Sequence, residues 1–369
     1  GPTGVRFEFF NDNWGRAGHN DDGVTYCPSN SAIAATWNRE LAGKSGTVLG
    51  EEARGRGKDI ILAPGVNVMR TPLCGRNFEY FTEDPYLNSQ VAIGYVKGLQ
   101  DQKVVATLKH YAANNQEWDR NNVSSDIDER VLHEIYLPVY RAAIQEAGAG
   151  AVMDSYNPLN GVHATENSWL NIDVLRKQWG FKGILMSDWT SVYSGVGAAN
   201  GGLDLEMPVG KFMTREIENG IVKEETIDAK VRHILQTLIA FGALDTPRED
   251  KSIDKDNAQS KEIALDLARE GVVLLKNDNG TLPYRNGKTL VIGPNADIIP
   301  TGGGSGFVTP YSVVSLYDGM VQLKGGRQIE LLSDSILYKD MSQQIYTDGS
   351  FTQNGFKGEY YNTRNLTGE

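Results

Sequence analysis

Short apolar segments alternate with longer helical segments between residues 58 and 242, and this alternation constrains the fold more than any other feature. The apolar segments, each of a length suited to a buried strand, are residues 59–63, 104–109, 151–155, 183–187 and 202–206. Residues 129–147 show the clearest helical periodicity, with Gly148 as a stop signal. This order predicts an α/β fold with βα units around a parallel sheet. The strands are too few for a regular eight-stranded barrel, so we expect an irregular (β/α) TIM-like barrel over residues 1–242.

Polar and ionisable residues stand at the end of four of these segments or just after it. They are Asn67 and Arg70, then Lys109 and His110, then residues 154–157, and finally Asp188 and Trp189. In a (β/α) barrel the carboxyl ends of the strands meet at one face, where active sites lie. The sequence therefore predicts that these side chains gather at one end of the sheet.

The composition changes after Gly242, where residues 243–259 are charged, contain proline and are expected to form a linker. A helix over residues 260–270 and strands at 272–275 and 289–292 then predict the start of an α/β sandwich domain, over residues 260–353. The glycine-rich run at residues 302–306 lacks the Lys-Ser/Thr ending of a phosphate loop, so we expect no nucleotide site there.

Charge and composition narrow the classes of ligand. A net charge of −11 and a pI near 5.1 argue against a nucleic-acid partner, because phosphate binding needs basic residues. No apolar run approaches the roughly 18 residues of a membrane span. The two cysteines, Cys27 and Cys74, show no metal-ligand spacing, and we expect neither a metal nor a cofactor. A neutral ligand such as a sugar fits this composition better.

Asp188 lies in the segment Ser187-Asp188-Trp189 at the end of an apolar strand and has two interpretations. Aspartate often caps the first turn of a helix, and residues 190–199 could be helical. Alternatively, the carboxylate is the nucleophile of glycosyl transfer, and Trp189 offers a flat apolar wall to a sugar. The residue pattern alone favours the cap, because capping aspartates far outnumber catalytic ones.

Lys109 and His110 also have two interpretations, since adjacent cationic groups are costly to bury without partners. They could pair with helix-capping carboxylates, or they could donate hydrogen bonds to sugar hydroxyls. Zinc binding by His110 is not expected, because no second ligand stands at a suitable spacing. In the loop at residues 76–85, Arg76 could brace a carboxylate such as Glu79, Glu83 or Asp84, or it could face the ligand.

Taken together, these segments resemble glycoside hydrolase family three, the β-glucosidase and β-xylosidase family. The motifs that carry the resemblance follow one another in the family's order. They are Gly1-Pro2-Thr3-Gly4-Val5-Arg6, the loop at 75–85, Lys109-His110, Ser155-Tyr156-Asn157, Ser187-Asp188-Trp189, Leu203-Asp204-Leu205-Glu206-Met207-Pro208, Leu274-Leu275-Lys276-Asn277 and Ile292-Gly293-Pro294-Asn295-Ala296.

The resemblance implies an irregular barrel followed by an α/β sandwich, and it assigns roles to particular residues. By this resemblance Asp188 is the nucleophile of a retaining mechanism. The residues implied to hold or shape the sugar are Arg76, Lys109, His110, Met153, Tyr156 and Trp189. The implied reaction is exo-acting hydrolysis of a β-glucoside or oligosaccharide, with release of terminal non-reducing glucose.

Two parts of the family pattern are missing from the sequence. The family's hydroxyl-binding Asp would precede Gly1, and its acid/base Glu, which cannot be assigned here, is expected beyond Glu369. Residues 355–361 resemble the opening of a carbohydrate-binding β-sandwich of the anthrax protective antigen type, expected from residue 354 onward. We therefore expect the chain to be part of a longer protein, periplasmic or secreted rather than cytoplasmic.

Alternative functions remain at this point. A β-xylosidase of the same family differs only in a pocket for one hydroxymethyl group. The N-acetylglucosaminidase branch is disfavoured, because no Pro-Gly-His follows Lys109-His110-Tyr111. A non-catalytic carbohydrate-binding protein on a decayed glycosidase scaffold is disfavoured by the intact Ser187-Asp188-Trp189. The sequence leaves the oligomeric state open.

Overall fold

The computed structural model describes residues 3–6, 23–284, 287–301, 303–323, 325 and 327–332. The carbohydrate-binding module predicted from residue 354 lies outside these residues. The described chain forms two compact units, one containing residues up to 274 together with 303–312, and the other containing 275–301 and 313–332. The predicted boundaries after residues 242, 259 and 353 stay predictions. Within the described residues, no helix is long and apolar enough to cross a membrane.

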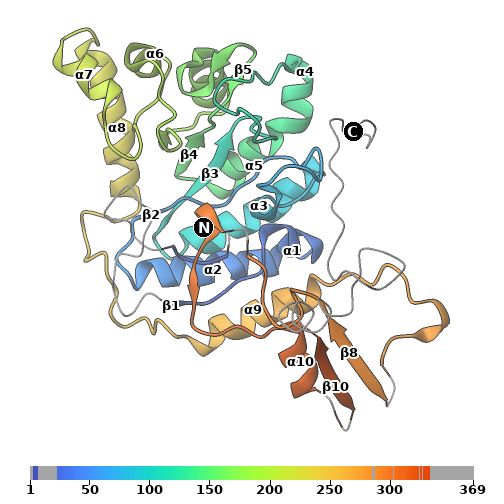
Figure 1. Ribbon diagram of the computed structural model, residues 1–369. Helices are drawn as coiled ribbons and strands as arrows, with labels where there is room; N and C mark the ends of the chain where they lie inside the picture. The colour runs from blue at the N-terminus through green and yellow to red at the C-terminus, as the bar shows by residue number, and fades with distance from the viewer. Residues whose placement is uncertain are drawn as a thin grey trace, which may run out of the picture. The chain divides into compact units, whose positions relative to one another are not determined.

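The first unit is built on a parallel sheet whose strands follow one another in space in their chain order (Figure 1). The strands are β2 (Ile60–Ile61), β3 (Val105–Tyr111), β4 (Ala151–Asp154) and β7 (Ile184–Met186). The prediction of βα units around a parallel sheet is thereby confirmed. The fifth predicted strand, at 202–206, is reduced to one parallel bridge between Leu205 and Met186.

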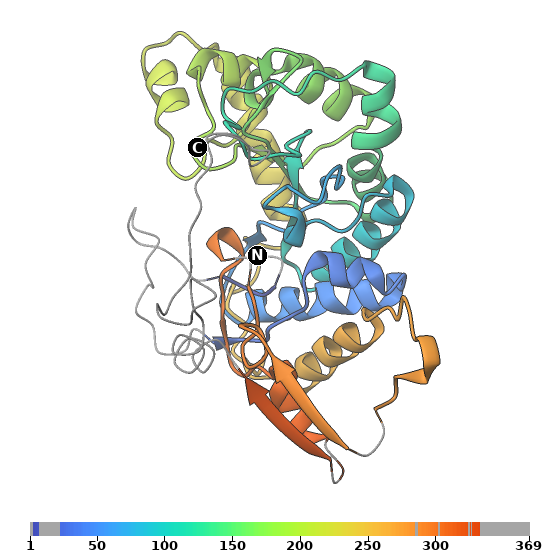
Figure 2. The same ribbon diagram turned by 45° about the vertical axis from the view of Figure 1, so that its right-hand side comes forward.

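Helices cover the sheet on its outer side, where α3 packs against both α2 and α5 (Figures 1 and 2). The α-helices of this unit are α1 (Asn30–Ala35), α2 (Arg39–Arg54), α3 (Pro85–Gln100), α4 (Glu129–Val131), α5 (Pro138–Ala147), α6 (Gly195–Asn200), α7 (Phe212–Glu218), α8 (Glu224–Ala240) and α9 (Ala258–Glu270). Glycines let α2 and α3 approach closely, because a Cβ on Gly98 would lie 1.9 Å from the Gly43 carbonyl oxygen.

Short elements complete this unit. They are the 3-10 helices η1 (Asn77–Glu79), η3 (Ala164–Glu166) and η6 (Gly304–Gly306), the π-helices η2 (Leu132–Tyr136) and η4 (Trp169–Gln178), the antiparallel pair β5 (Pro158–Leu159) and β6 (Val162–His163), and the parallel pair β1 (Gly23–Val24) and β9 (Thr309–Pro310). The helix predicted over 129–147 is confirmed in extent but divided into α4, η2 and α5. The division falls at Pro138, whose ring nitrogen has no hydrogen to donate to the preceding turn.

The strands are buried on both faces, which explains their continuous apolar character. Alternate residues of β4 point to opposite sides, so Met153 joins an apolar cluster with Val105 and Met186, whereas Val152 packs in the larger core shared with the helices. The smaller cluster also includes Met207, which follows the bridge at Leu205.

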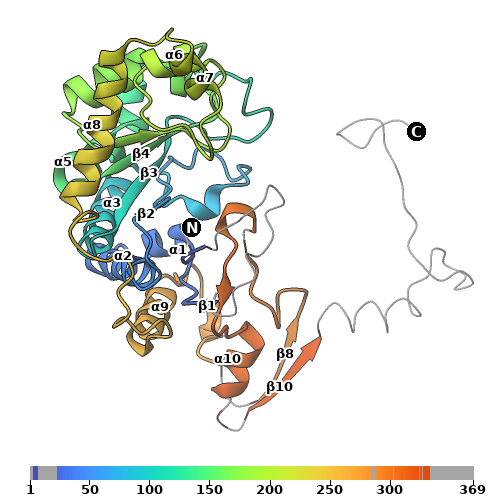
Figure 3. The ribbon, with the colours of Figure 1, turned by 90° about the vertical axis from the view of Figure 1, so that its left-hand side faces the viewer.

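The second unit contains a βαβ arrangement (Figure 3). Strands β8 (Lys288–Ile292) and β10 (Gln328–Leu332) pair in parallel, and α10 (Leu316–Gln322) lies between them in the chain, after the 3-10 turn η5 (Asp278–Gly280). The strand predicted at 289–292 and the helix predicted at 260–270 are confirmed. The strand predicted at 272–275 is wrong. These residues form an exposed loop, because no described strand supplies hydrogen-bonding partners for them.

Asp154 is a fully buried carboxyl group at the end of β4. Its Oδ2 accepts a hydrogen bond of 3.3 Å from Asn171, and its Oδ1 accepts none from the described residues. Burial raises the pKa of Asp154 well above its usual value, although the hydrogen bond from Asn171 and the charge of Arg176 act in the opposite direction. A carboxyl group whose folded pKa is raised stabilises the fold at low pH and loses that contribution as the pH rises through the folded pKa.

We predict that Asp154→Asn gains stability relative to the parent protein as the pH is raised from about 4 towards 8, because the amide never has to ionise in the core. The measurement is the free energy of unfolding in urea at several pH values. The control is Asp173→Asn on η4, whose carboxylate is half exposed in an ion pair with Lys177. Parallel pH profiles for Asp154→Asn and the parent would contradict the prediction.

Candidate active site

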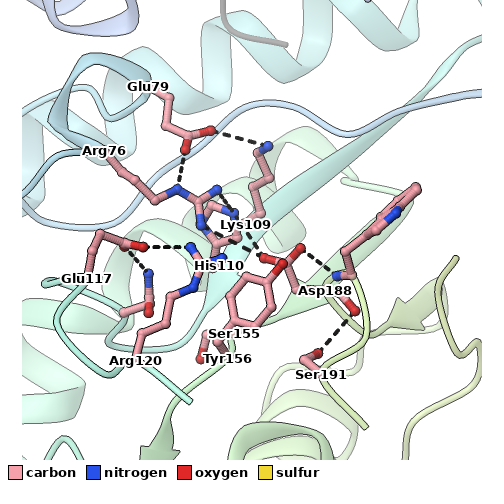
Figure 4. A network of polar contacts seen from close by, with 12 residues as sticks. Arg76, Glu79, Lys109, His110, Glu117, Arg120, Ser155, Tyr156, Asp188 and Ser191 are labelled. Carbon is pink, nitrogen blue, oxygen red and sulfur yellow. Dashed lines mark hydrogen bonds and ion pairs between the residues drawn. The ribbon is translucent and has the colours of Figure 1, made fainter. Parts of the chain in front are cut away.

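Side chains from four successive strand ends meet around Asp188 (Figure 4). Arg76 comes from the loop after β2, His110 from the end of β3, Tyr156 from the segment after β4, and Asp188 itself from the segment after β7. The side chain of Asp188 lies 3.9 Å from Arg76 Nη1 and 3.5 Å from His110 Nε2, both measured from its Oδ2. Because parallel strands end at one edge of a sheet, residues far apart in the sequence share one site.

The backbone around Asp188 is held by local hydrogen bonds. Its carbonyl oxygen accepts from the hydroxyls of Ser187 at 2.8 Å and Ser191 at 3.1 Å, and its Oδ1 accepts from the backbone N–H of Trp189 at 2.7 Å. The interpretation of Asp188 as a helix cap is wrong, because the next helix, α6, is capped by Ser194. The Oδ2 of Asp188 is buried and accepts no hydrogen bond from the described residues, so a lone pair remains available.

Glu79 is fully buried between two cations. Its Oε1 lies 2.5 Å from Arg76 Nε, and its Oε2 lies 3.2 Å from Lys109 Nζ. Burial by itself would raise the pKa of Glu79, but the charges of Lys109 and Arg76 outweigh it and lower the pKa. The interpretation that Arg76 braces a carboxylate of its loop is confirmed, because it pairs with Glu79; Arg76 also lies near Asp188, and its contact with a ligand stays a prediction. Asp84 is instead the N-cap of α3.

His110 is completely buried beside cations, and this environment determines its charge. Burial, and then the charges of Arg76 and Lys109, hold the pKa of His110 well below its usual value, so the ring is neutral. Arg76 Nη2 lies 2.6 Å from His110 Nε2 and can only donate, so we assign Nε2 as the acceptor. The ring proton is then on Nδ1, which lies 3.2 Å from the hydroxyl of Tyr80.

Tyr156 borders Asp188 on another side and brings in residues that the sequence analysis missed. Burial raises the pKa of Tyr156, and the charge of Asp188 raises it further. The guanidinium of Arg120 lies 3.8 Å from the centre of the Tyr156 ring, and Glu117 holds Arg120 through a 2.6 Å ion pair. The signal that could have found them is their place in the loop directly after Lys109 and His110.

The remaining predicted site residues take different positions. Met153 is buried in the apolar cluster on the inner side of the sheet. Trp189 contributes its backbone N–H to Asp188 and is partly buried. The sugar-binding roles of both residues stay predictions.

Comparison with known proteins identifies the family. The model of the glycosyl hydrolase family 3 N-terminal domain matches residues 10–237, and that of the C-terminal domain matches residues 272–349. The chain belongs to glycosyl hydrolase family 3. The family and fold implied by the sequence motifs, a barrel-like domain followed by an α/β domain, are confirmed.

Relatives of this family 3 chain include characterised β-glucosidases. A β-glucosidase from Rhizobium radiobacter is 43% identical over 298 residues, which cover 78% of this chain and 36% of the relative. The β-glucosidase BoGH3A from Bacteroides ovatus is 38% identical over 384 residues, which cover 95% of this chain and 48% of the relative. The chain thus spans about half the length of the curated relatives it matches, or less.

Solved structures of β-glucosidases also match the fold of this chain. The structure of β-glucosidase 3B from Thermotoga neapolitana in complex with α-D-glucose matches with a TM-score of 0.81 at 33% identity, over 96% of this chain and 51% of that one. DesR, a β-glucosidase from Streptomyces venezuelae in complex with D-glucose, matches with a TM-score of 0.80 at 33% identity, over 90% of this chain and 44% of that one.

We predict that Glu79→Gln destabilises the protein by about 3–5 kcal/mol, because two buried cations lose their counter-charge. The loss should be largest at neutral pH. The pKa of Glu79 is lower in the folded protein than in the unfolded protein, where it is about 4.3. The ionised side chain therefore stabilises the fold above about pH 4.3, and this contribution is lost as the pH falls through the folded pKa.

Urea denaturation at pH values from about 3 to 7 measures this effect. The matched control is Glu83→Gln, an exposed glutamate in the same loop, which should change stability by less than about 0.5 kcal/mol. Equal stability of the two variants at neutral pH would show that Glu79 does not hold the two cations in place.

Proposed function

We propose that this chain provides the nucleophile and the glucose-binding residues of a retaining, exo-acting β-glucosidase. The observation that carries the proposal is the environment of Asp188 Oδ2, which is buried, faces Arg76 and His110, and accepts no hydrogen bond from the described residues. A carboxylate oxygen in this condition can attack an anomeric carbon without first losing a hydrogen bond. The names of the relatives support glucose as the sugar released.

The proposed first step forms a covalent ester between Asp188 and the anomeric carbon, with departure of the leaving oxygen. Arg76 and Lys109 donate hydrogen bonds to sugar hydroxyls, and Glu79, which pairs with both, partly balances their charges. Neutral His110 keeps the site from gaining another positive charge. Met153, Tyr156 and Trp189 shape the remaining walls of the glucose subsite.

A second carboxyl group must protonate the leaving oxygen and later activate water. Described carboxylates close to Asp188 are unsuited to this role, because Glu79 bridges two cations and Glu117 is paired with Arg120. Glu206 accepts hydrogen bonds from the backbone N–H groups of Phe212 and Met213, and it has the role of a structural cap. The acid/base residue therefore stays unassigned.

We predict that Asp188→Asn in the full-length protein lowers turnover of an aryl β-glucoside by at least about a thousandfold, because the amide cannot form the ester. The fold should be retained, as judged by circular dichroism and thermal unfolding. Asp173→Asn is the control with unchanged turnover. A fluorinated glucoside with a good leaving group should label the peptide containing Asp188, and activity within tenfold of the parent would exclude Asp188 as the nucleophile.

We predict that kcat/KM for an aryl β-glucoside exceeds that for the matching aryl β-xyloside by roughly tenfold or more. A pocket that binds the hydroxymethyl group should favour the transition state of the glucoside over that of the xyloside by about 1–3 kcal/mol. Both substrates are assayed side by side with the same aryl leaving group, so that only the glycone differs. A reversed ratio would assign the protein as a β-xylosidase.

A further inference from the structure

A stacked aromatic pair lies next to the site and has no role in the chemistry described so far. The rings of His163, in β6, and Tyr193, between β7 and α6, have centroids 3.8 Å apart and planes inclined by 23°. Parallel stacking of this kind holds both rings in one orientation. The pair thus forms a flat, rigid surface assembled from two segments that follow different strands.

Hydrogen bonds fix this surface to the loops that build the site. The hydroxyl of Tyr193 donates to the backbone carbonyl of Tyr156 at 3.2 Å. His163 Nε2 lies 2.9 Å from the backbone carbonyl of Asn121, which can only accept, so Nε2 carries a proton. Asn121 directly follows Arg120, whose guanidinium stacks on Tyr156. The pair is therefore tied to both members of the Arg120–Tyr156 stack.

The pair is close to the nucleophile but open to solvent. Burial raises the pKa of Tyr193 to about 12, the charge of Arg120 opposes this shift, and the charge of Asp188 adds to it. The phenol therefore lies within the electrostatic influence of both charged groups. Tyr193 is nevertheless 37% exposed, whereas Asp188 is 7% exposed, so the aromatic surface lies nearer to solvent than the reacting carboxylate.

We propose that the His163–Tyr193 pair binds the leaving group of the substrate, through the carbon-bound face of a second sugar ring or through an aryl ring. This inference rests on the proposed glucosidase function and names a specificity determinant for it. In an exo-acting enzyme the terminal sugar is enclosed, and the leaving group must extend from the nucleophile towards solvent. An immobile aromatic surface at this position binds a flat apolar face with little loss of side-chain entropy.

The test compares substrates that share glucose but differ in what leaves. Tyr193→Ala should lower kcat/KM for cellobiose and for an aryl β-glucoside by about 3- to 10-fold more than it lowers kcat/KM for β-glucosyl fluoride. Fluoride is too small to reach the aromatic pair. Tyr193→Phe, which keeps the ring and removes only the hydroxyl, should retain at least half of the activity of the parent on cellobiose.

The control is Tyr86→Ala, a 75% exposed tyrosine on α3, which should leave all three substrates unaffected. Equal losses on all three substrates for Tyr193→Ala would overturn the proposal, because Tyr193 would then act on the glucose subsite or on the fold. A loss in Tyr193→Phe as large as in Tyr193→Ala would overturn it too, in favour of the hydrogen bond to Tyr156. If the parent protein hydrolysed none of the three, the glucosidase function itself would fail, which is a distinguishable result.

Discussion

The site depends on one buried charge, the carboxylate of Glu79. Arg76 and Lys109 approach one another inside the protein, where water cannot screen their charges, and two unpaired cations there would cost several kcal/mol. Glu79 binds one with each carboxylate oxygen and is itself fully buried. Arg76 can therefore be fixed near Asp188 without forming a tight ion pair with it.

The pairing of Glu79 with Arg76 and Lys109 explains the hydrogen bonding of Asp188 and the charge of His110. Arg76 Nη1 stays 3.9 Å from Asp188 Oδ2, which is far enough to leave a lone pair of the carboxylate unused. Arg76 also donates to His110, and burial together with the nearby cations holds the pKa of that imidazole well below its usual value. A protonated His110 at this position would form an ion pair with Asp188.

In the loops that follow the strands, polar side chains are likewise held by contacts with partner groups. Arg120 is held by Glu117 in its own loop and by the ring of Tyr156, and Tyr193 is held by the carbonyl of Tyr156. These contacts join loops after β3, β4 and β7 into one rim. Rigid placement matters there, because a misplacement of about 1 Å in an active site can cost about a hundredfold in rate.

The sequence by itself determined the alternation of strands and helices, the polar strand ends and the family, because these follow from local periodicity and contiguous motifs. Tertiary structure decided what each polar group does. Asp188 and a helix-capping aspartate look alike in sequence, and only the position of Ser194 at the start of α6 separates them. Glu79 stands three residues from Arg76 in the sequence, but only the approach of β3 to this loop gave it Lys109 as a second partner. The apolar composition of residues 272–275 predicts a strand, but a strand forms only where another chain segment supplies hydrogen-bonding partners. Partners such as Lys109 for Glu79, or a neighbouring strand for an apolar run, come from distant residues, and no local pattern records them.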